Sequence, residues 1–259
     1  MEKQNYKFYI EYDGTRYSGW QRLKDEKKEK TIQGKIENLL DRLYDFPKNY
    51  TEIIGSGRTD AGVHAKEQIF NVALPNTKTI EKILSYCNNY LPEDIKITKI
   101  EKVKEKFHSR YNAIQKEYHY KISLDKPSPF LKNFVCYCPN IKNIDAMKKA
   151  SQKFIGEHDF VCFSSLKKSK LIKTKKSTVR KIEKIEIIYD EIEKIYTFKF
   201  IGNGFLKNMI RILMGTLIEI GENKRKIESI EKIFESKKRE NAGFLAQAKG
   251  LTLFKVNYK

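Results

Sequence analysis

Residues 55–65 read GSGRTDAGVHA and place Arg58, Thr59 and Asp60 between two glycines. Glycine adopts backbone angles that are closed to other residues, and aspartate readily hydrogen-bonds to backbone amides in turns. One interpretation is a tight turn in which Asp60 satisfies its own backbone. The other is a rigid bend that presents a carboxylate and a guanidinium to a ligand. The spacing alone favours the plain turn, so the rest of the chain has to decide.

The composition predicts a folded protein with an anionic partner. The chain has 259 residues, of which 40% are hydrophobic, so it can build one large domain or two of ordinary size. Lys and Arg together number 52 against 33 acidic residues, which gives a net charge of +19. A soluble protein with this excess usually binds a polyanion, most commonly a nucleic acid and next an anionic membrane.

Membrane insertion and a zinc site are both disfavoured by the sequence. The most apolar stretch, 209–220, contains two charged residues and is shorter than the ~20 apolar residues that span a bilayer. The opening residues lack the apolar run of a secretion signal, so we expect a cytoplasmic protein with reduced cysteines. Cys136 and Cys138 have no second pair to complete a zinc site, and we interpret them as structural strand residues.

The spacing of apolar residues predicts two successive α+β halves. Expected strands cover 6–12, 68–74, 95–100, 117–124, 180–188, 196–200 and 251–258. Expected helices cover 32–43 with Thr31 as N-cap, 80–87, 143–154, 204–220 with Gly221 as C-cap, and 226–236. We expect residues 1–106 and 107–259 to form the two halves, each an antiparallel or mixed sheet with helices on one face.

The densest basic stretch lies at 164–181 and contains few apolar residues, which predicts a solvated loop. A generic charged surface is one interpretation. However, Lys173, Lys175, Lys176 and Arg180 carry charges of one sign, which repel each other unless a polyanion is present. The stretch therefore favours contact with RNA or DNA.

Arg211 lies in the expected helix among apolar neighbours. Helical spacing would gather Lys207, Asn208, Arg211 and Gly215 on one side and leave Met209 and others in the core. A partly buried guanidinium requires a carboxylate or phosphate partner. Any acidic residue on a nearby element could be that partner, so the spacing alone assigns no function.

Two aromatic stretches are also candidates. Tyr118 shares one strand face with Tyr120 and Ile122, and a tyrosine there ordinarily packs in the core. The stretch FHSRYNA at 107–113 includes Arg110 between aromatic residues, a mixture that suits base stacking and phosphate contact.

The stretch GSGRTDAGVHA closely resembles the signature of the tRNA pseudouridine synthases that act on the anticodon stem and loop. Further stretches resemble the same family in the same order, so the resemblance covers essentially the whole chain. They are YDGTRYSGWQ (12–21), TIQGKIE (31–37), FHSRYNA, KEYHYKI (116–122), GEHDFVCF (156–163), TVRKI (178–182), FLKNMIRILMG (205–215) and AQAKGLTLFKVNY (246–258).

The resemblance implies roles for individual residues. The family's catalytic aspartate corresponds to Asp60, and the arginine that helps to displace the target base corresponds to Arg58. The active-site tyrosine corresponds to Tyr118, and the arginine that pairs with the aspartate corresponds to Arg211. Arg110 joins Arg58 and Tyr118 among the expected substrate-binding residues.

The resemblance also implies an activity and an assembly. The expected reaction isomerises uridine to pseudouridine in tRNA, at the family's target positions 38, 39 and 40, without cofactor or metal. The expected protein is a homodimer whose two α+β halves surround a central basic RNA-binding cleft. Two alternatives remain, namely the same chemistry on another RNA such as rRNA and a non-catalytic RNA-binding protein. Leu23 and Gln247 depart from the family's glutamine and proline, and neither lies among the expected catalytic residues.

Overall fold

The computed structural model describes residues 2–23, 30–166 and 177–259, and the chain divides into two compact units. The first unit comprises Met1–Ile114 and Thr252–Lys259, and the second comprises Gln115–Leu251. Relative to the expected halves, residues 107–114 and the C-terminal strand belong with the first unit. The C-terminal strand does so because it pairs in parallel with a first-unit strand, through Thr252 opposite His64 and Leu253 opposite Ala65.

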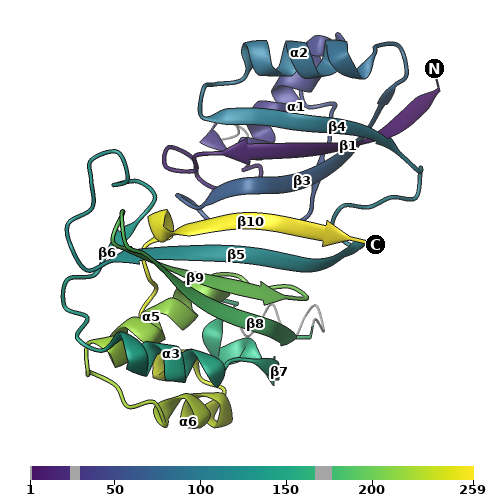
Figure 1. The fold of residues 1–259 in the computed structure, drawn as a ribbon. Helices are drawn as coiled ribbons and strands as arrows, with labels where there is room; N and C mark the ends of the chain where they lie inside the picture. Colours follow the sequence, from purple (N-terminus) through teal and green to yellow (C-terminus); the bar gives the residue numbers. More distant parts are fainter. Residues whose placement is uncertain (1, 24–29, 167–176) are drawn as a thin grey trace. The chain divides into compact units, whose positions relative to one another are not determined.

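The first unit contains a mixed sheet with two helices on one face (Figure 1). Its strands are β1 (Lys3–Tyr12), β2 (Ile54–Gly55), β3 (His64–Pro75), β4 (Ile95–Val103) and β10 (Leu251–Tyr258). Its helices are α1 (Ile32–Leu43) and α2 (Ile80–Tyr90). Strand β1 pairs antiparallel with both β3 and β4. The expected cap of α1 is confirmed, because the Thr31 hydroxyl accepts the Gly34 amide hydrogen at 3.2 Å.

The second unit is built on an antiparallel sheet in the order β5-β9-β8-β7. Its strands are β5 (Ala113–Ser123), β6 (Cys136–Tyr137), β7 (Gly156–Asp159), β8 (Val179–Asp190) and β9 (Ile195–Gly202). Its helices are α3 (Ile144–Gln152), α5 (Met209–Gly221) and α6 (Ser229–Ser236), which gather on one face of that sheet (Figure 1). Short 3₁₀ turns lie at Phe160–Phe163, Arg239–Asn241 and Ala248–Gly250. The α+β class with two sheet-and-helix halves is therefore confirmed.

Helix α5 begins five residues later than the spacing predicts, and that expectation was wrong. Asn208 has a left-handed backbone with φ of 61°, and Gly204 has a φ of 157°, so neither residue continues a helix. Gly221 is the last helical residue rather than the cap, which is Glu222. Consequently Lys207 and Asn208 precede the helix instead of sharing a face of it. No described helix is long and apolar enough to span a bilayer.

Candidate active site

The loop that carries Asp60 lies between β2 and β3 in the first unit. Its turn is closed where the Val63 amide donates to the Asp60 carbonyl at 3.1 Å, and Gly62 has a positive φ of 75°. Thr59 is buried, Asp60 is half-buried and Arg58 is exposed. The loop therefore anchors itself through Thr59 and leaves the Arg58 side chain at the surface.

The stretch between β1 and α1 packs backbone-to-backbone against this loop. The Trp20 amide donates to the Thr59 carbonyl at 3.0 Å. A Cβ on Gly14 would lie 2.0 Å from the Val63 carbonyl oxygen, and one on Gly19 would lie 2.6 Å from the Thr59 carbonyl oxygen. Two glycines outside the loop thus permit the close approach that fixes its position.

Buried side chains hold the loop from the sheet side. The Tyr12 hydroxyl and the Thr59 Oγ1 are 2.8 Å apart, and burial raises the pKa of Tyr12. Gln68 on β3 is fully buried, donates to the Gly57 carbonyl at 3.0 Å and accepts from the Ser56 hydroxyl at 2.5 Å. The loop is therefore braced on both sides of Arg58 by residues that belong to β1 and β3.

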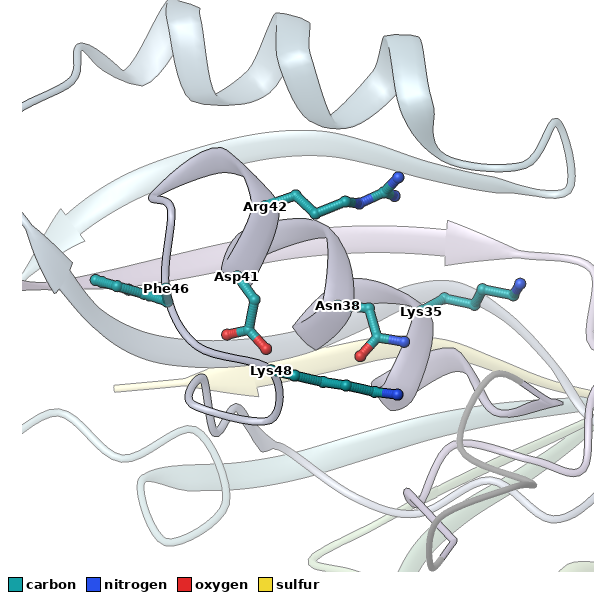
Figure 2. Close-up of a pocket in the computed structure, with 6 residues that line it drawn as sticks. All are labelled: Lys35, Asn38, Asp41, Arg42, Phe46 and Lys48. Atoms are coloured by element: carbon teal, nitrogen blue, oxygen red, sulfur yellow. The ribbon is translucent and has the colours of Figure 1, made fainter.

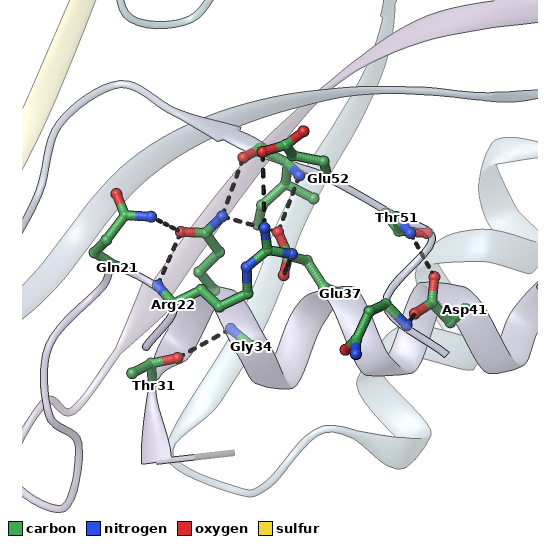
Figure 3. A network of polar contacts seen from close by, with 11 residues as sticks. Gln21, Arg22, Thr31, Gly34, Glu37, Asp41, Thr51 and Glu52 are labelled. Atoms are coloured by element: carbon green, nitrogen blue, oxygen red, sulfur yellow. Dashed lines mark hydrogen bonds and ion pairs between the residues drawn. The ribbon is translucent and has the colours of Figure 1, made fainter. Parts of the chain in front are cut away.

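A buried polar network holds the residues that follow Trp20 (Figure 3). Glu37 of α1 is 0% exposed and accepts from Gln33 Nε2 at 2.8 Å, from Arg22 Nη1 at 3.0 Å and from the Ile53 amide at 3.2 Å. Gln33 in turn accepts from Gln21 Nε2 at 2.8 Å and from the Arg22 amide at 3.0 Å. Because Trp20 contacts Thr59, the network connects α1 to the support of the Asp60 loop.

Arg110 lies on a second fixed loop of the first unit, between β4 and β5. Ser109 is fully buried; its amide donates to Asn71 Oδ1 at 2.8 Å, and its carbonyl accepts from the Tyr258 hydroxyl at 2.7 Å. Arg110 beside it is exposed, and Tyr111 is 79% exposed. The loop thus presents a cation and an aromatic ring on an anchored backbone.

In the second unit, the non-helical segment 203–208 contacts Tyr118 and Arg211 and lies near Arg180, the three predicted residues that the structure describes there. The ring of Tyr118, which is buried on β5, packs edge-on against Phe205 with centroids 5.3 Å apart. A Cβ on Gly204 would lie 3.7 Å from Arg180 Nε, and Arg211 Nη1 donates to Asn208 Oδ1 at 3.5 Å. The late start of α5 therefore gathers Tyr118, Arg180 and Arg211 around one segment. Burial lowers the pKa of Arg180.

The stretch before β10 orients Arg211. Arg211 Nε donates to the Ala246 carbonyl at 2.7 Å, and the Ala246 amide donates to the Arg211 carbonyl at 3.1 Å. The Tyr120 hydroxyl donates to the Gln247 carbonyl at 2.8 Å. Because this contact uses the backbone of Gln247, the departure from proline leaves it intact. Cys136 Sγ and Cys138 Sγ lie 3.5 Å apart as buried, free thiols.

The structure thus places Arg58, Asp60 and Arg110 in the first unit and Tyr118, Arg180 and Arg211 in the second. Lys173, Lys175 and Lys176 lie outside the described residues. Within residues 2–23, 30–166 and 177–259, no three His, Cys, Asp or Glu side chains are grouped to hold a metal ion.

Sequence reasoning missed several residues that support these positions. Gly14 and Gly19 were present in the family-like stretch, but their role depends on a loop forty residues away. Glu37 was hidden because a charged helix residue usually faces solvent. The available signal was its spacing, because Glu37 lies four residues after Gln33 and three before Leu40 and so shares the buried side of α1 with them.

Comparisons of the chain with a family profile and with individual known proteins point to the same family. A profile described as tRNA pseudouridine synthase matches residues 9–112 and 150–259. The chain is 45% identical over 255 residues to a protein named tRNA pseudouridine synthase A from Bacillus sp. (strain KSM-64), covering 98% of this chain and 99% of that protein. It is 44% identical over 257 residues to tRNA pseudouridine synthase A 2 of Clostridium tetani, covering 98% of each chain. The chain therefore belongs to the tRNA pseudouridine synthase family.

Proposed function

We propose that the protein isomerises uridine to pseudouridine in the anticodon stem and loop of tRNA, at the positions that the family resemblance implies. The observation that carries the proposal is the braced loop 57–62, which fixes Thr59 through backbone and hydroxyl contacts and leaves Arg58 exposed beside Asp60. Such bracing is unnecessary for a plain surface turn. It suits a site in which a carboxylate must be held in one place relative to a reacting atom.

The reaction breaks the bond from ribose C1′ to uracil N1 and joins C1′ to C5, with loss of the C5 proton and gain of a proton at N1. Atoms and electrons balance within the nucleoside, so the proposal requires no oxidant or group donor. A uridine stacked in a helix cannot present C1′ or C6 and has to leave the stack, at a cost of a few kcal/mol. The exposed Arg58 is the proposed group that fills the vacated space or holds the displaced backbone.

Asp60 is the proposed catalytic carboxylate. It attacks the sugar or the base, or removes a ribose proton, and all three routes require its ionised form. Burial by the bound RNA would disfavour that form, and a neighbouring guanidinium would restore it. We assign this role to Arg211, whose Nε donates to the Ala246 carbonyl at 2.7 Å and whose Nη1 donates to Asn208 Oδ1 at 3.5 Å. Tyr118 is the proposed stacking partner of the extruded base.

The RNA contacts and assembly are proposed from charge and from family membership. Arg110 and Arg180, with Lys173, Lys175 and Lys176, are proposed to contact phosphates of the RNA. The net charge of +19 supports a polyanionic partner. We propose a homodimer, as expected for this family.

The proposed function is tested by following the hydrogen at C5. A tRNA transcript tritiated at C5 of uridine releases label into water only if C5 forms a new bond. We expect release with the wild type, and loss of release by at least a thousandfold with Asp60→Asn while tRNA binding persists. Glu93→Gln removes one exposed carboxylate from the same unit and serves as the matched control, for which we expect normal release.

Two results would contradict the proposal. Label release that is unaffected by Asp60→Asn would remove the carboxylate from the chemistry. Release from an rRNA transcript but not from tRNA would keep the chemistry and assign it to another RNA. Sequencing the modified transcript for pseudouridine identifies which uridines are converted.

A further inference from the structure

A second basic site lies in the first unit, along the exposed side of α1. A pocket of about 490 Å³ is lined there by Lys35, Asn38, Asp41, Arg42, Phe46 and Lys48 (Figure 2). Three of these residues are cationic and one is a carboxylate, so the lining has a net charge of +2 (three minus one). None of the six is among the residues that the family resemblance assigns to catalysis or substrate binding.

The three cations are brought together by helix geometry and by the turn that follows α1. Lys35, Asn38 and Arg42 are three and four residues apart, so they lie along one side of the helix. Lys48 comes from the turn after the helix. Figure 2 shows the nitrogen-bearing ends of Lys35, Arg42 and Lys48 directed toward the same side of the pocket. Arg42 and Lys48 are exposed, so their charges are accessible to a ligand.

The one carboxylate is occupied by the backbone. Asp41 is 4% exposed, and its two oxygens accept the amide hydrogens of Asn49 at 3.0 Å and Thr51 at 2.7 Å. These bonds tie the turn to α1, and the ring of Phe46 packs against Tyr50 with centroids 4.4 Å apart. The turn that carries Lys48 is therefore held in place before any ligand binds, which reduces the ordering cost of binding.

The pocket is separate from the loop that carries Asp60. The Ile32 and Gln33 amides at the start of α1 bond to the Gly19 and Trp20 carbonyls, and Trp20 contacts that loop. Arg42 is ten residues further along the helix, which corresponds to about 15 Å at 1.5 Å per residue. The Arg42 end of the pocket is therefore remote from the end of α1 that packs against the support of this loop.

We propose that this pocket binds backbone phosphates of the substrate tRNA at nucleotides remote from the target uridine; the inference rests on the proposed function. Arginine and lysine are the side chains suited to phosphate, through paired and single contacts respectively. The cations reach the pocket on long side chains from α1 and from the turn after it, so the pocket is a weak cage for one small anion. A polyanion gains more, because each neutralised phosphate releases condensed counterions.

The test compares two double variants with equal loss of charge. Arg42→Ala/Lys48→Ala removes two pocket cations, and Lys82→Ala/Lys96→Ala removes two exposed cations from α2 and β4 of the same unit. Affinity for a full-length tRNA transcript is measured by fluorescence anisotropy between 50 and 200 mM salt. Loss of two phosphate contacts lowers the salt slope by about 1.8. The wild type should then lose about 12-fold more affinity than the pocket variant over this fourfold salt range.

The control variant should keep the wild-type slope, and the pocket variant should raise KM for tRNA without changing kcat. Equal salt slopes of tRNA affinity for the two double variants would overturn the inference, because the loss of two charges anywhere on the unit would then explain the lower slope. Binding of inorganic phosphate that depends on Arg42 and Lys48, with an unchanged RNA slope, would also overturn it and assign a small-anion site. A pocket-dependent slope without label release from tRNA would refute the proposed function and leave the RNA contact standing.

Discussion

Replacing Glu37 with alanine tests whether the buried network supports the site. Glu37 is 0% exposed, and its carboxylate accepts hydrogen bonds from Gln33 Nε2, Arg22 Nη1 and the Ile53 amide at 2.8, 3.0 and 3.2 Å. Glu37→Ala leaves the buried Ile53 amide without its acceptor and leaves Gln33 Nε2 with only its longer bond to the Ile53 carbonyl at 3.4 Å. It also leaves the Arg22 guanidinium without its buried partner.

The expected cost follows from these contacts. Each buried donor that loses its acceptor costs about 1–3 kcal/mol. The Arg22 side chain is 31% exposed, so its guanidinium can reach water and contributes only about 0–1 kcal/mol. The Ile53 amide contributes about 2 kcal/mol of this loss and the shorter bond of Gln33 about 1 kcal/mol, so the free energy of unfolding of the first unit should fall by about 3 kcal/mol. With a urea dependence of about 2 kcal/mol per M, the unfolding midpoint should move down by about 1.5 M.

The assay is urea unfolding followed by tryptophan fluorescence. The chain has one tryptophan, and Trp20 is 2% exposed within the first unit, so its emission reports on this unit. Glu52→Ala is the matched control, because Glu52 lies 3.7 Å from Arg22 Nη2 but its side chain is 77% exposed. An exposed ion pair is worth about 0.5 kcal/mol, so we expect a midpoint shift of about 0.25 M.

Equal midpoints for Glu37→Ala and Glu52→Ala would refute the reasoning, because burial would then carry no extra cost. Glu37→Gln keeps one acceptor oxygen and should fall between the wild type and Glu37→Ala. A destabilised Glu37→Ala that keeps full label release at low temperature would separate the network's stabilising effect from any effect on the Asp60 loop.

Two further predictions concern the contacts of that loop. Gly14→Ala would place a Cβ 2.0 Å from the Val63 carbonyl oxygen, so the loop has to shift. We expect kcat/KM for label release to fall about 100-fold as a result. An unchanged kcat/KM would show that the position of the loop does not matter for the reaction. Burial raises the pKa of Tyr12 in the folded protein above its pKa of about 10 in the unfolded chain. The contribution of Tyr12 to the free energy of unfolding is therefore complete below about pH 10 and is lost as the pH rises toward the folded pKa. Tyr12→Phe should therefore reduce the pH dependence of the unfolding free energy above pH 10 by up to about 1.4 kcal/mol per pH unit, and an unaltered dependence would contradict this assignment.

The sequence alone determined the features that depend on local spacing. Alternation in 6–12 predicted a strand whose Tyr6, Phe8 and Ile10 are all 0% exposed in the structure. Thr31 was identified as the cap of α1 because capping involves residues only three positions apart. The motif at 55–65, with the stretches that accompany it in order, was sufficient to identify the family.

Only the tertiary structure decided which distant segments meet. Gly14 and Gly19 support the Asp60 loop because their missing side chains admit its backbone, and nothing in their own neighbourhood indicates that partner. The start of α5 was mispredicted because the helical spacing of apolar residues extends back through 204–208. In the structure Asn208 adopts a left-handed backbone, so the helix can begin only at Met209. Spacing along a helix or strand records which face is buried, but the partner that covers this face is set by packing between segments far apart in the chain.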